Sequence, residues 1–175
     1  VATFRDPDGI WARYAIEDVA TPEAFARDPG LVHAFYNARR AALPGVAPNP
    51  AHRALAELET GLEAKGGRLF LCTQNVDDLH ERGGSRRVVH MHGELAKVRC
   101  ENCGDRRVRL EDLSVRTPCP ACATPGFLRP DVVWFGETPM HMEAIYEALL
   151  DADLFVSIGT SGAVYPAAGF VREAR

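Results

Sequence analysis

Prolines divide the first part of the chain into segments whose apolar residues recur at helical spacing. Thr21-Pro22 and Asp28-Pro29 each place a capping residue directly before a proline, which is typical of a helix start. Two short helices are therefore predicted. We expect the second helix to turn one apolar stripe toward the core, made of Leu31, Phe35 and Ala38.

A longer helix is predicted after Asn49-Pro50 and ends at Gly66-Gly67. His52, near its start, is expected to be a structural hydrogen-bonding residue and not a catalytic one. The pattern predicts one continuous apolar face on this helix, made of Ala51, Ala54, Leu55, Leu58 and Leu62.

Three apolar runs predict strands, at Arg68 to Thr73, Leu128 to Trp134 and Leu154 to Ile158, and we place all three in one sheet. An amphipathic helix around His141 to Leu150 precedes the last of them. The alternation of helix and strand favours a doubly wound α/β fold. Because sheets average roughly five or six strands, we expect the chain to be an interior part of a larger domain, with flanking segments that could carry a targeting signal.

Composition excludes few classes of protein, but it does not favour nucleic acid or a membrane as a partner. A length of 175 residues and a hydrophobic content of 46% suit one sizeable core plus a small subdomain. The 20 basic and 24 acidic residues leave a net charge of only −4, which does not indicate a nucleic-acid or membrane surface. No apolar run reaches the roughly 20 residues of a membrane-spanning helix, so we expect no membrane partner.

The stretch from Thr73 to Glu94 carries the candidate chemistry. Gln74, Asn75 and Asp77 follow the first strand, and a second short apolar run leads to His92. Ligands of open α/β sheets bind at the carboxyl ends of strands, so these polar residues could share one cleft with a histidine base. The alternative is a polar turn with a surface His90 and a hydrogen-bonded His92.

Two C-x2-C pairs have the spacing of a zinc site. Fifteen residues separate the pairs, and four thiolates brought together by two tight turns would leave zinc no open position. The sequence therefore predicts a structural zinc ion, with two disulfides or four unrelated thiols as alternatives. Reduced thiolates indicate a cytoplasmic compartment. The predicted ligands are Cys100, Cys103, Cys119 and Cys122.

Two further patterns could bind ligands. Tyr36 and Arg39, three residues apart on a predicted helix, could receive a carboxylate, although an ordinary helix edge gives the same pattern. The turn Gly159-Thr160-Ser161 after the last strand would let a nucleotide approach the backbone, but such a turn is common. Trp134 and Phe135 could enclose an aliphatic stem. The segments Val133 to Glu137 and Gly162 to Tyr165 could accept a peptide between them by strand addition.

Taken together, these motifs resemble the sirtuins, which are NAD-dependent protein lysine deacylases. The resemblance spans essentially the whole chain and rests on the order of Phe4-Arg5, Gln74-Asn75-Val76-Asp77, His92-Gly93, the two C-x2-C pairs, Val133-Trp134-Phe135-Gly136-Glu137 and Gly159-Thr160-Ser161. Ala34-Phe35-Tyr36 with Arg39 is similar to the bacterial deacetylase/desuccinylase subgroup. The resemblance implies a Rossmann-like doubly wound parallel sheet with a small zinc-binding and helical domain.

The resemblance also implies roles for individual residues. His92 would be the general base, and Asn75 and Asp77 would order the ribose, a water and the nicotinamide amide. Other NAD contacts would come from Phe4, Arg5, Trp11, Gln74, Val76, Gly159, Thr160 and Ser161. The acyl-lysine would contact Tyr36, Arg39, Val133, Phe135, Gly136 and Glu137. The products would be nicotinamide, O-acyl-ADP-ribose and free lysine.

The implied domains are residues 1–45 for the cofactor-binding loop and helical part, 46–92 and 128–175 for the Rossmann-like domain, and 93–127 for the zinc module. The family's glycine-rich first turn and its last strand would lie outside the chain. Acylated lysine-containing proteins would be the partners. A zinc-ribbon nucleic-acid-binding module is the alternative, but acidic residues interrupt its basic patch of Lys97, Arg99, Arg106, Arg107 and Arg109. A zinc hydrolase is disfavoured because the predicted metal site is closed.

Overall fold

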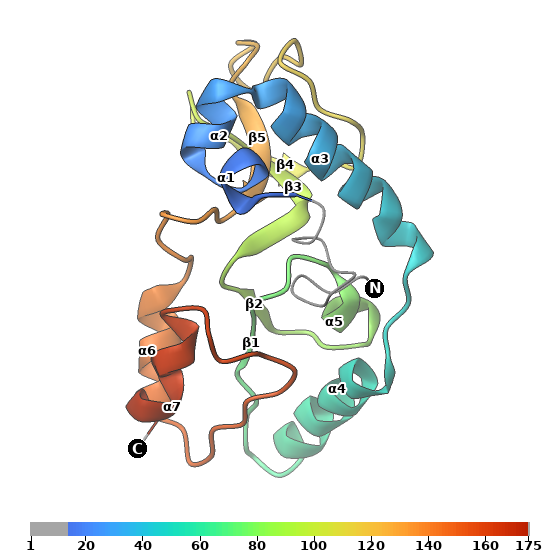
Figure 1. Cartoon of the computed structure of the whole chain (residues 1–175). Helices are drawn as coiled ribbons and strands as arrows, with labels where there is room; N and C mark the ends of the chain where they lie inside the picture. Colours follow the sequence, from blue (N-terminus) through green and yellow to red (C-terminus); the bar gives the residue numbers. More distant parts are fainter. Residues whose placement is uncertain (1–13, 175) are drawn as a thin grey trace. The chain divides into compact units, whose positions relative to one another are not determined.

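The computed structural model describes residues 14–174, which divide after Met140 into two compact units. The first unit contains two small sheets and five helices, and the second is helical (Figure 1). The first unit begins with three helices and a short 3-10 turn, α1 (Ile16–Val19), α2 (Pro22–Arg27), α3 (Pro29–Ala42) and η2 (Leu43–Gly45). It continues with α4 (Pro50–Glu63), β1 (Leu71–Thr73), α5 (Leu79–Arg82), β2 (Val88–His90), β3 (Gly93–Cys100), β4 (Arg106–Val108) and β5 (Leu128–Val132).

The helix starts lie where the capping residues predict them. The Thr21 hydroxyl accepts from the Ala24 N–H, and the Asp28 carboxylate accepts from the Leu31 N–H. Before α4, Asn49 and His52 each accept from the other's backbone N–H, a reciprocal capping box. The structural role predicted for His52 is therefore confirmed.

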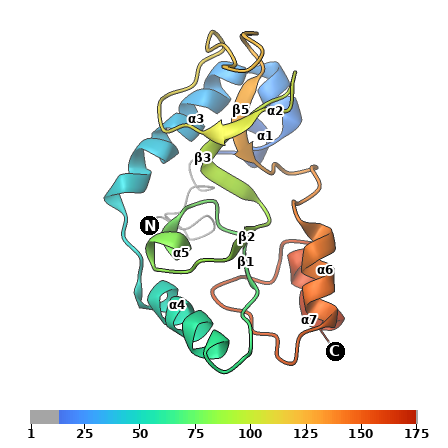
Figure 2. The same ribbon diagram turned by 180° about the vertical axis from the view of Figure 1, so that it is seen from behind.

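The larger sheet is antiparallel, with the strand order β4-β3-β5. Helices α1 to α3 lie against one side of it, and the strands are seen from behind in Figure 2. A buried cluster joins these helices to the sheet through Val32, Phe35, Tyr36, Leu95, Val132 and Trp134.

An irregularity in β3 changes which of its residues point inward. The register jumps between Glu94 and Val98, so the buried positions change from odd residues to even ones. Leu95 consequently packs in the helical cluster, whereas Val98 and Cys100 pack with Cys119 in a second cluster. Strand β3 therefore contributes buried residues to both hydrophobic clusters.

The smaller sheet is the parallel pair β1-β2, in which Leu71 lies opposite Val88 and Thr73 lies opposite His90. The connection between these strands contains α5, and α4 packs against α5. The helix-then-strand order predicted for this region is therefore confirmed, although the first strand begins at Leu71 and not at Arg68.

The other two strand predictions also need correction. The run from Leu128 does form a strand, but it ends at Val132 and pairs antiparallel with β3, so it does not join β1. Residues 154–158 form no strand in the described chain, and Leu154 is 79% exposed. An apolar run becomes a strand only where a neighbouring strand supplies hydrogen bonds, and no described strand does so for this run.

Two predicted helix faces are also rotated. The buried face of α3 carries Val32, Phe35 and Tyr36, while Leu31 and Ala38 are exposed. In α4 the buried residues are Ala56 and Glu59, because this face packs toward α5, and Leu58 is exposed. Tertiary neighbours, and not apolar content alone, select the buried face.

The second unit consists of α6 (Met142–Leu150), η3 (Ala167–Gly169) and α7 (Phe170–Glu173). The two α-helices contact each other, and the Tyr146 ring meets the Phe170 ring edge-on at 6.1 Å. The amphipathic helix predicted around His141 to Leu150 is confirmed.

Candidate active site and cysteine cluster

His92 stands between β2 and β3 with one ring nitrogen held by the backbone. Its Nδ1 lies 3.1 Å from the Gln74 carbonyl oxygen. A carbonyl can only accept, so Nδ1 carries the proton and Nε2 keeps a lone pair. Burial lowers the pKa of His92 more than the Gln74 carbonyl raises it. The ring is therefore neutral at pH 7 and can act as a base through Nε2.

His90, two residues earlier, has the opposite environment. Its Nε2 lies 2.7 Å from a Glu81 carboxylate oxygen, and its Nδ1 lies 3.4 Å from the Asn75 carbonyl. Burial disfavours the charged ring, but the Glu81 hydrogen bond and charge outweigh it and hold the pKa of His90 above its ordinary value. His90 is buried, which corrects the alternative in which it was a surface residue.

The polar turn after β1 is fixed mainly by backbone hydrogen bonds. The Asn75 N–H donates to the Thr73 hydroxyl at 3.1 Å, and the Asp77 carboxylate accepts from the Leu79 N–H at the start of α5. The Val76 carbonyl accepts from the Leu95 N–H at 2.7 Å. With Gln74 bonded to His92, the structure brings Gln74, Asn75, Val76 and Asp77 into one turn beside His92.

Gly93 lets β3 approach β5 closely behind this histidine. Its φ is +81°, and a Cβ added there would collide with the Asp131 carbonyl. The neighbouring Val133 N–H donates to the His92 carbonyl at 2.9 Å. The segment after β5 is therefore fastened directly to the histidine-bearing strand end.

The buried Arg129 side chain holds two residues of that segment, Trp134 and Glu137. Its guanidinium lies 3.2 Å from the centre of the Trp134 ring and donates to the Glu137 carboxylate at 2.7 and 2.9 Å. Glu137 also accepts from Arg99 and from the Trp134 N–H, and these bonds lower its pKa although burial opposes the shift. The Glu137 side chain therefore stabilises the loop, and its predicted place in a substrate groove stays a prediction.

Sequence reasoning missed Arg129, whose one signal is its position in the same short run as Trp134.

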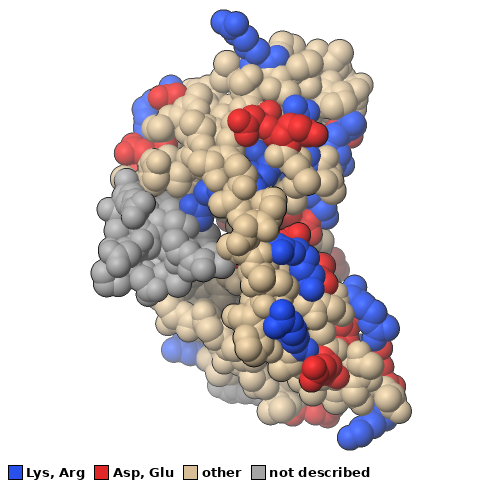
Figure 3. Space-filling model, turned by 90° about the vertical axis from the view of Figure 1, so that its right-hand side faces the viewer, with Lys and Arg blue, Asp and Glu red and all other residues tan. Residues whose placement is uncertain are grey.

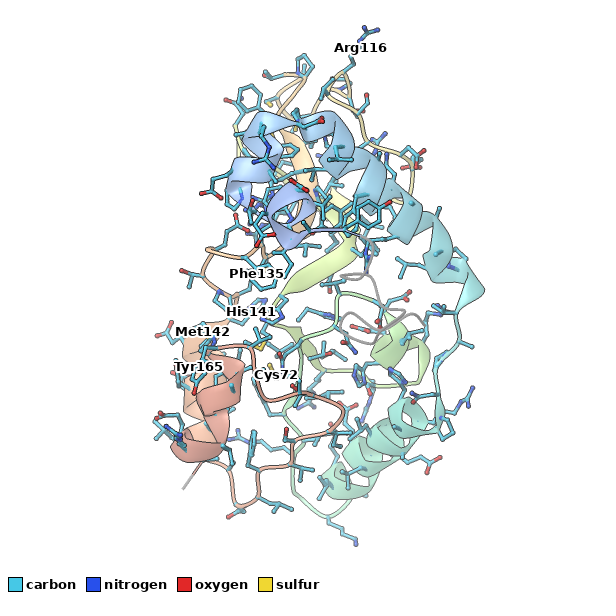
Figure 4. All side chains as sticks on the ribbon, in the orientation of Figure 1. Cys72, Arg116, Phe135, His141, Met142 and Tyr165 are labelled. Carbon is cyan, nitrogen blue, oxygen red and sulfur yellow. The ribbon has the colours of Figure 1, made fainter. Side chains whose placement is uncertain are left out.

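Trp134 and Phe135 differ in exposure, which corrects their predicted equivalence. Trp134 is 2% exposed, whereas Phe135 is 42% exposed and projects from the segment after β5 (Figure 4). Only Phe135 is placed to meet a ligand from solvent. Val133 is half-buried and Gly136 is exposed, and their substrate contacts stay predictions.

Tyr36 and Arg39 lie side by side on α3, as predicted. The Tyr36 hydroxyl accepts from the Trp134 indole N–H at 2.9 Å, and burial raises the pKa of Tyr36 to about 12. The Arg39 guanidinium lies 4.8 Å from the centre of the Phe35 ring. A neutral phenol and an adjacent cation are suitable groups for binding a carboxylate.

The four predicted cysteines converge in the second cluster. Their sulfur atoms all lie within 4.8 Å of one another, with Cys100 3.8 Å from Cys122 and Cys103 3.7 Å from Cys119. A disulfide would require about 2.05 Å, so all four are free thiols. Four thiolates about 2.3 Å from one zinc ion in a tetrahedron lie about 3.8 Å apart. The geometry therefore fits one closed, four-coordinate zinc site.

The remaining predicted NAD contacts fall outside the described residues or belong to the second unit. Phe4, Arg5 and Trp11 fall outside the described residues. Gly159, Thr160 and Ser161 are exposed and belong to the second unit. Their contact with NAD stays a prediction.

The basic patch of the alternative nucleic-acid module is neutralised. Each of its members lies within 4.0 Å of a carboxylate, pairing Lys97 with Glu94, Arg99 with Glu101 and Glu137, Arg106 with Asp131, Arg107 with Asp105 and Arg109 with Glu111. Basic and acidic side chains are also interspersed on the face shown in Figure 3. Within residues 14–174, no helix is both long enough and apolar enough to cross a membrane.

Comparison with known proteins places these features in a family. A sequence model of the Sir2 family matches residues 1–166. The NAD-dependent protein deacylase of Caulobacter vibrioides is 62% identical over the whole chain, which covers 74% of that protein. The protein of the same name from Salmonella typhimurium is 56% identical, and the chain covers 64% of it.

Solved structures agree with the sequence comparisons. A Sir2 homologue in complex with ADP-ribose has a TM-score of 0.88 and 40% identity, covering 99% of this chain and 69% of that one. A Sir2 homologue in complex with NAD gives a TM-score of 0.85, also at 40% identity, with 99% of this chain and 67% of that one covered. The predicted α/β class with a small cysteine-bearing domain is thereby confirmed. The chain belongs to the Sir2 family.

Proposed function

We propose that this chain carries the catalytic part of an NAD-dependent protein lysine deacylase that uses His92 as its base. The observation that carries the proposal is the His92 ring itself, which is neutral, half-buried and held at Nδ1, so that Nε2 keeps the lone pair that can accept a proton. The names of the relatives and the bound ADP-ribose and NAD of the solved homologues support NAD as the co-substrate.

The turn after β1 supplies the groups that would orient the nucleotide. Asn75 is exposed beside His92, and its neutral amide can hold a ribose hydroxyl, a water or a carboxamide without adding charge near a departing cationic ring. Asp77 already accepts from the Leu79 N–H, so its carboxylate has a fixed position. The role of His92 is then to take a proton from a ribose hydroxyl after nicotinamide has left.

The acyl group would meet Tyr36 and Arg39. We propose that the enzyme removes acetyl and also succinyl groups, because a phenol beside a guanidinium binds the terminal carboxylate that a succinyl group carries and an acetyl group lacks. The products would be free lysine, nicotinamide and O-acyl-ADP-ribose. Acylated proteins would be the partners, and a structure of a sirtuin with a deacetylated p53 peptide supports this class.

The cysteine cluster would hold one structural zinc ion. A closed thiolate site gives zinc no position for water, so the ion would stabilise the module and take no part in the reaction. Free thiols at this spacing suit the reducing cytoplasm, which we propose as the compartment.

The test is an assay of the full-length protein on acetyl-lysine and succinyl-lysine peptides of identical sequence, with and without NAD. We expect both peptides to be turned over only with NAD. The double variant Tyr36→Phe with Arg39→Met should lose roughly 100-fold in desuccinylation, since two carboxylate contacts of about 1.5 kcal/mol each are removed, and less than threefold in deacetylation. Equal losses on both peptides would show that the pair is structural, and turnover without NAD would refute the proposed function.

A further inference from the structure

Trp134 is buried and is held by contacts on several sides. Its ring stacks on the Arg129 guanidinium at 3.2 Å and lies 5.3 Å from the Phe25 ring, and its backbone N–H donates to Glu137 at 2.7 Å. Arg129 in turn donates to the Val132 carbonyl at 3.0 Å. The direction of the indole N–H is therefore fixed before any ligand arrives.

That N–H points at the Tyr36 hydroxyl, 2.9 Å away and 98 residues earlier in the sequence. An indole nitrogen can only donate, so the phenol oxygen must be the acceptor in this bond. The phenol keeps one O–H, and no residue between 14 and 174 lies in position to accept from it. The Tyr36 hydroxyl is thus left as a donor without a described partner.

We propose that Trp134 is a specificity-determining residue, whose indole N–H commits the Tyr36 hydroxyl to donating toward an acidic acyl group. This inference rests on the proposed function. Tyr36 is 5% exposed, so water competes little for its O–H. Its raised pKa keeps the phenol protonated throughout the neutral range. A terminal carboxylate satisfies this donor, whereas the methyl of an acetyl group leaves it without an acceptor.

The same segment also connects the proposed acyl-selectivity residues with His92. Val133, next to Trp134, donates its backbone N–H to the His92 carbonyl, so one short segment contacts both the base and the tyrosine. Arg129 and Glu137 then act as positioning residues for the indole, because both hold Trp134.

The experiment is a double-mutant cycle of Trp134→Phe and Tyr36→Phe in the full-length protein, measured as kcat/KM on succinyl-lysine and acetyl-lysine peptides with NAD. Trp134→Phe keeps an aromatic ring and removes the N–H. We expect it to lower desuccinylation about three- to tenfold, the value of one hydrogen bond, and deacetylation less than twofold. The double variant should be no worse than Tyr36→Phe alone, because the tryptophan acts through the hydroxyl.

Phe25→Leu is the matched control, since it loosens packing on the Trp134 ring but leaves the N–H intact. It should reduce turnover of both peptides equally, if at all. Additive losses in the cycle, or equal losses on the two peptides in Trp134→Phe, would overturn the inference.

A spectroscopic measurement covers the case in which Trp134→Phe does not fold. In wild-type protein the Trp134 indole N–H resonance should shift when succinyl-lysine peptide is added and stay in place with acetyl-lysine peptide. The Tyr36→Phe substitution should abolish that response. A resonance indifferent to both peptides would overturn the inference.

Two outcomes separate this inference from the proposed function. NAD-dependent turnover of acetyl-lysine without any turnover of succinyl-lysine would refute the Trp134 proposal and leave the deacylase standing. Absence of NAD-dependent turnover of both peptides would refute the deacylase itself, and the selectivity proposal with it.

Discussion

Two regions of the first unit differ in how far the sequence alone predicts their chemistry. One is the cysteine module, which holds Cys100, Cys103, Cys119 and Cys122, and the other is the pair His90 and His92 beside the turn after β1. In the module, four identical side chains converge to sulfur–sulfur distances of 3.7 and 3.8 Å, as the two C-x2-C pairs predict. At the end of β2, beside the turn, His90 and His92 are identical residues two positions apart whose pKa values shift in opposite directions. The pKa of His90 is raised and that of His92 is lowered.

The difference between the two histidines comes from their partners. Both rings are shielded from water, which by itself disfavours the charged form. Among residues 14–174, the hydrogen-bond partner of the His90 Nε2 is the Glu81 carboxylate at 2.7 Å, whereas that of the His92 ring is the Gln74 carbonyl at 3.1 Å. A full negative charge compensates the cost of burying an imidazolium and a carbonyl dipole does not, so the pKa of His90 lies above its ordinary value and that of His92 lies below it.

The largest expected effect lies in the module. Cys100→Ser should release zinc and unfold the module around β3 to β5, because structural zinc binding contributes on the order of 10 kcal/mol to folding. Zinc content and thermal unfolding measure this. Cys72→Ser is the control, since Cys72 lies in β1 outside the cluster, and it should retain the metal. A Cys100→Ser protein that stays folded without metal would contradict the closed site.

At the turn, His92→Ala should keep the fold and lower the rate of deacylation by roughly 10²–10⁴-fold, the usual contribution of a general base. The base must be neutral, so wild-type kcat/KM should fall as pH drops through the pKa of His92. That decline should lie below pH 6.5 because the pKa is lowered. His141→Asn is a matched control at an exposed histidine with φ +61°, a conformation that asparagine tolerates. Near-wild-type turnover in His92→Ala would remove the base assignment.

A smaller effect separates the two histidines directly. Glu81→Gln should lower the pKa of His90 and leave that of His92 nearly unchanged, as followed by histidine resonances in an NMR titration. The folded-state pKa of His90 is raised, so its contribution to stability is fully present below the unfolded value of about 6.5 and is lost as pH rises through the folded value. The pKa of Glu81 is lowered despite burial, because the His90 hydrogen bond opposes that effect, so its contribution is lost only in acid.

Glu81→Gln should therefore cost about 0.5–1 kcal/mol near pH 6, and the cost should vanish at alkaline pH. Glu94→Gln is the control, since the Glu94 carboxylate lies farther from His90 Nε2, at 3.6 Å. Equal effects of the two substitutions on the pKa of His90 would show that general charge, and not the Glu81 hydrogen bond, sets the difference.

Local signals in the sequence predicted the parts of the fold that depend on near neighbours. Thr21, Asp28 and Asn49 cap their helices because a capping side chain reaches a backbone N–H only three residues ahead. The apolar run predicted the strand Leu128–Val132, but it did not predict which strand pairs with it. The same run could pair with a parallel strand or, as it does, antiparallel with β3. The buried faces of α3 and α4 were misplaced for the same reason.

By itself the sequence determined the two C-x2-C pairs, the helix starts and the turn from Gln74 to Asp77, because each depends on residues a few positions apart. Tertiary structure alone decided that Glu81 contacts His90, that the register jump between Glu94 and Val98 turns Cys100 inward, and that Trp134 donates to Tyr36 across 98 residues. These contacts join residues that belong to different helices, strands and loops, so no local spacing encodes them. The difference in pKa between His92 and His90 belongs to this second group.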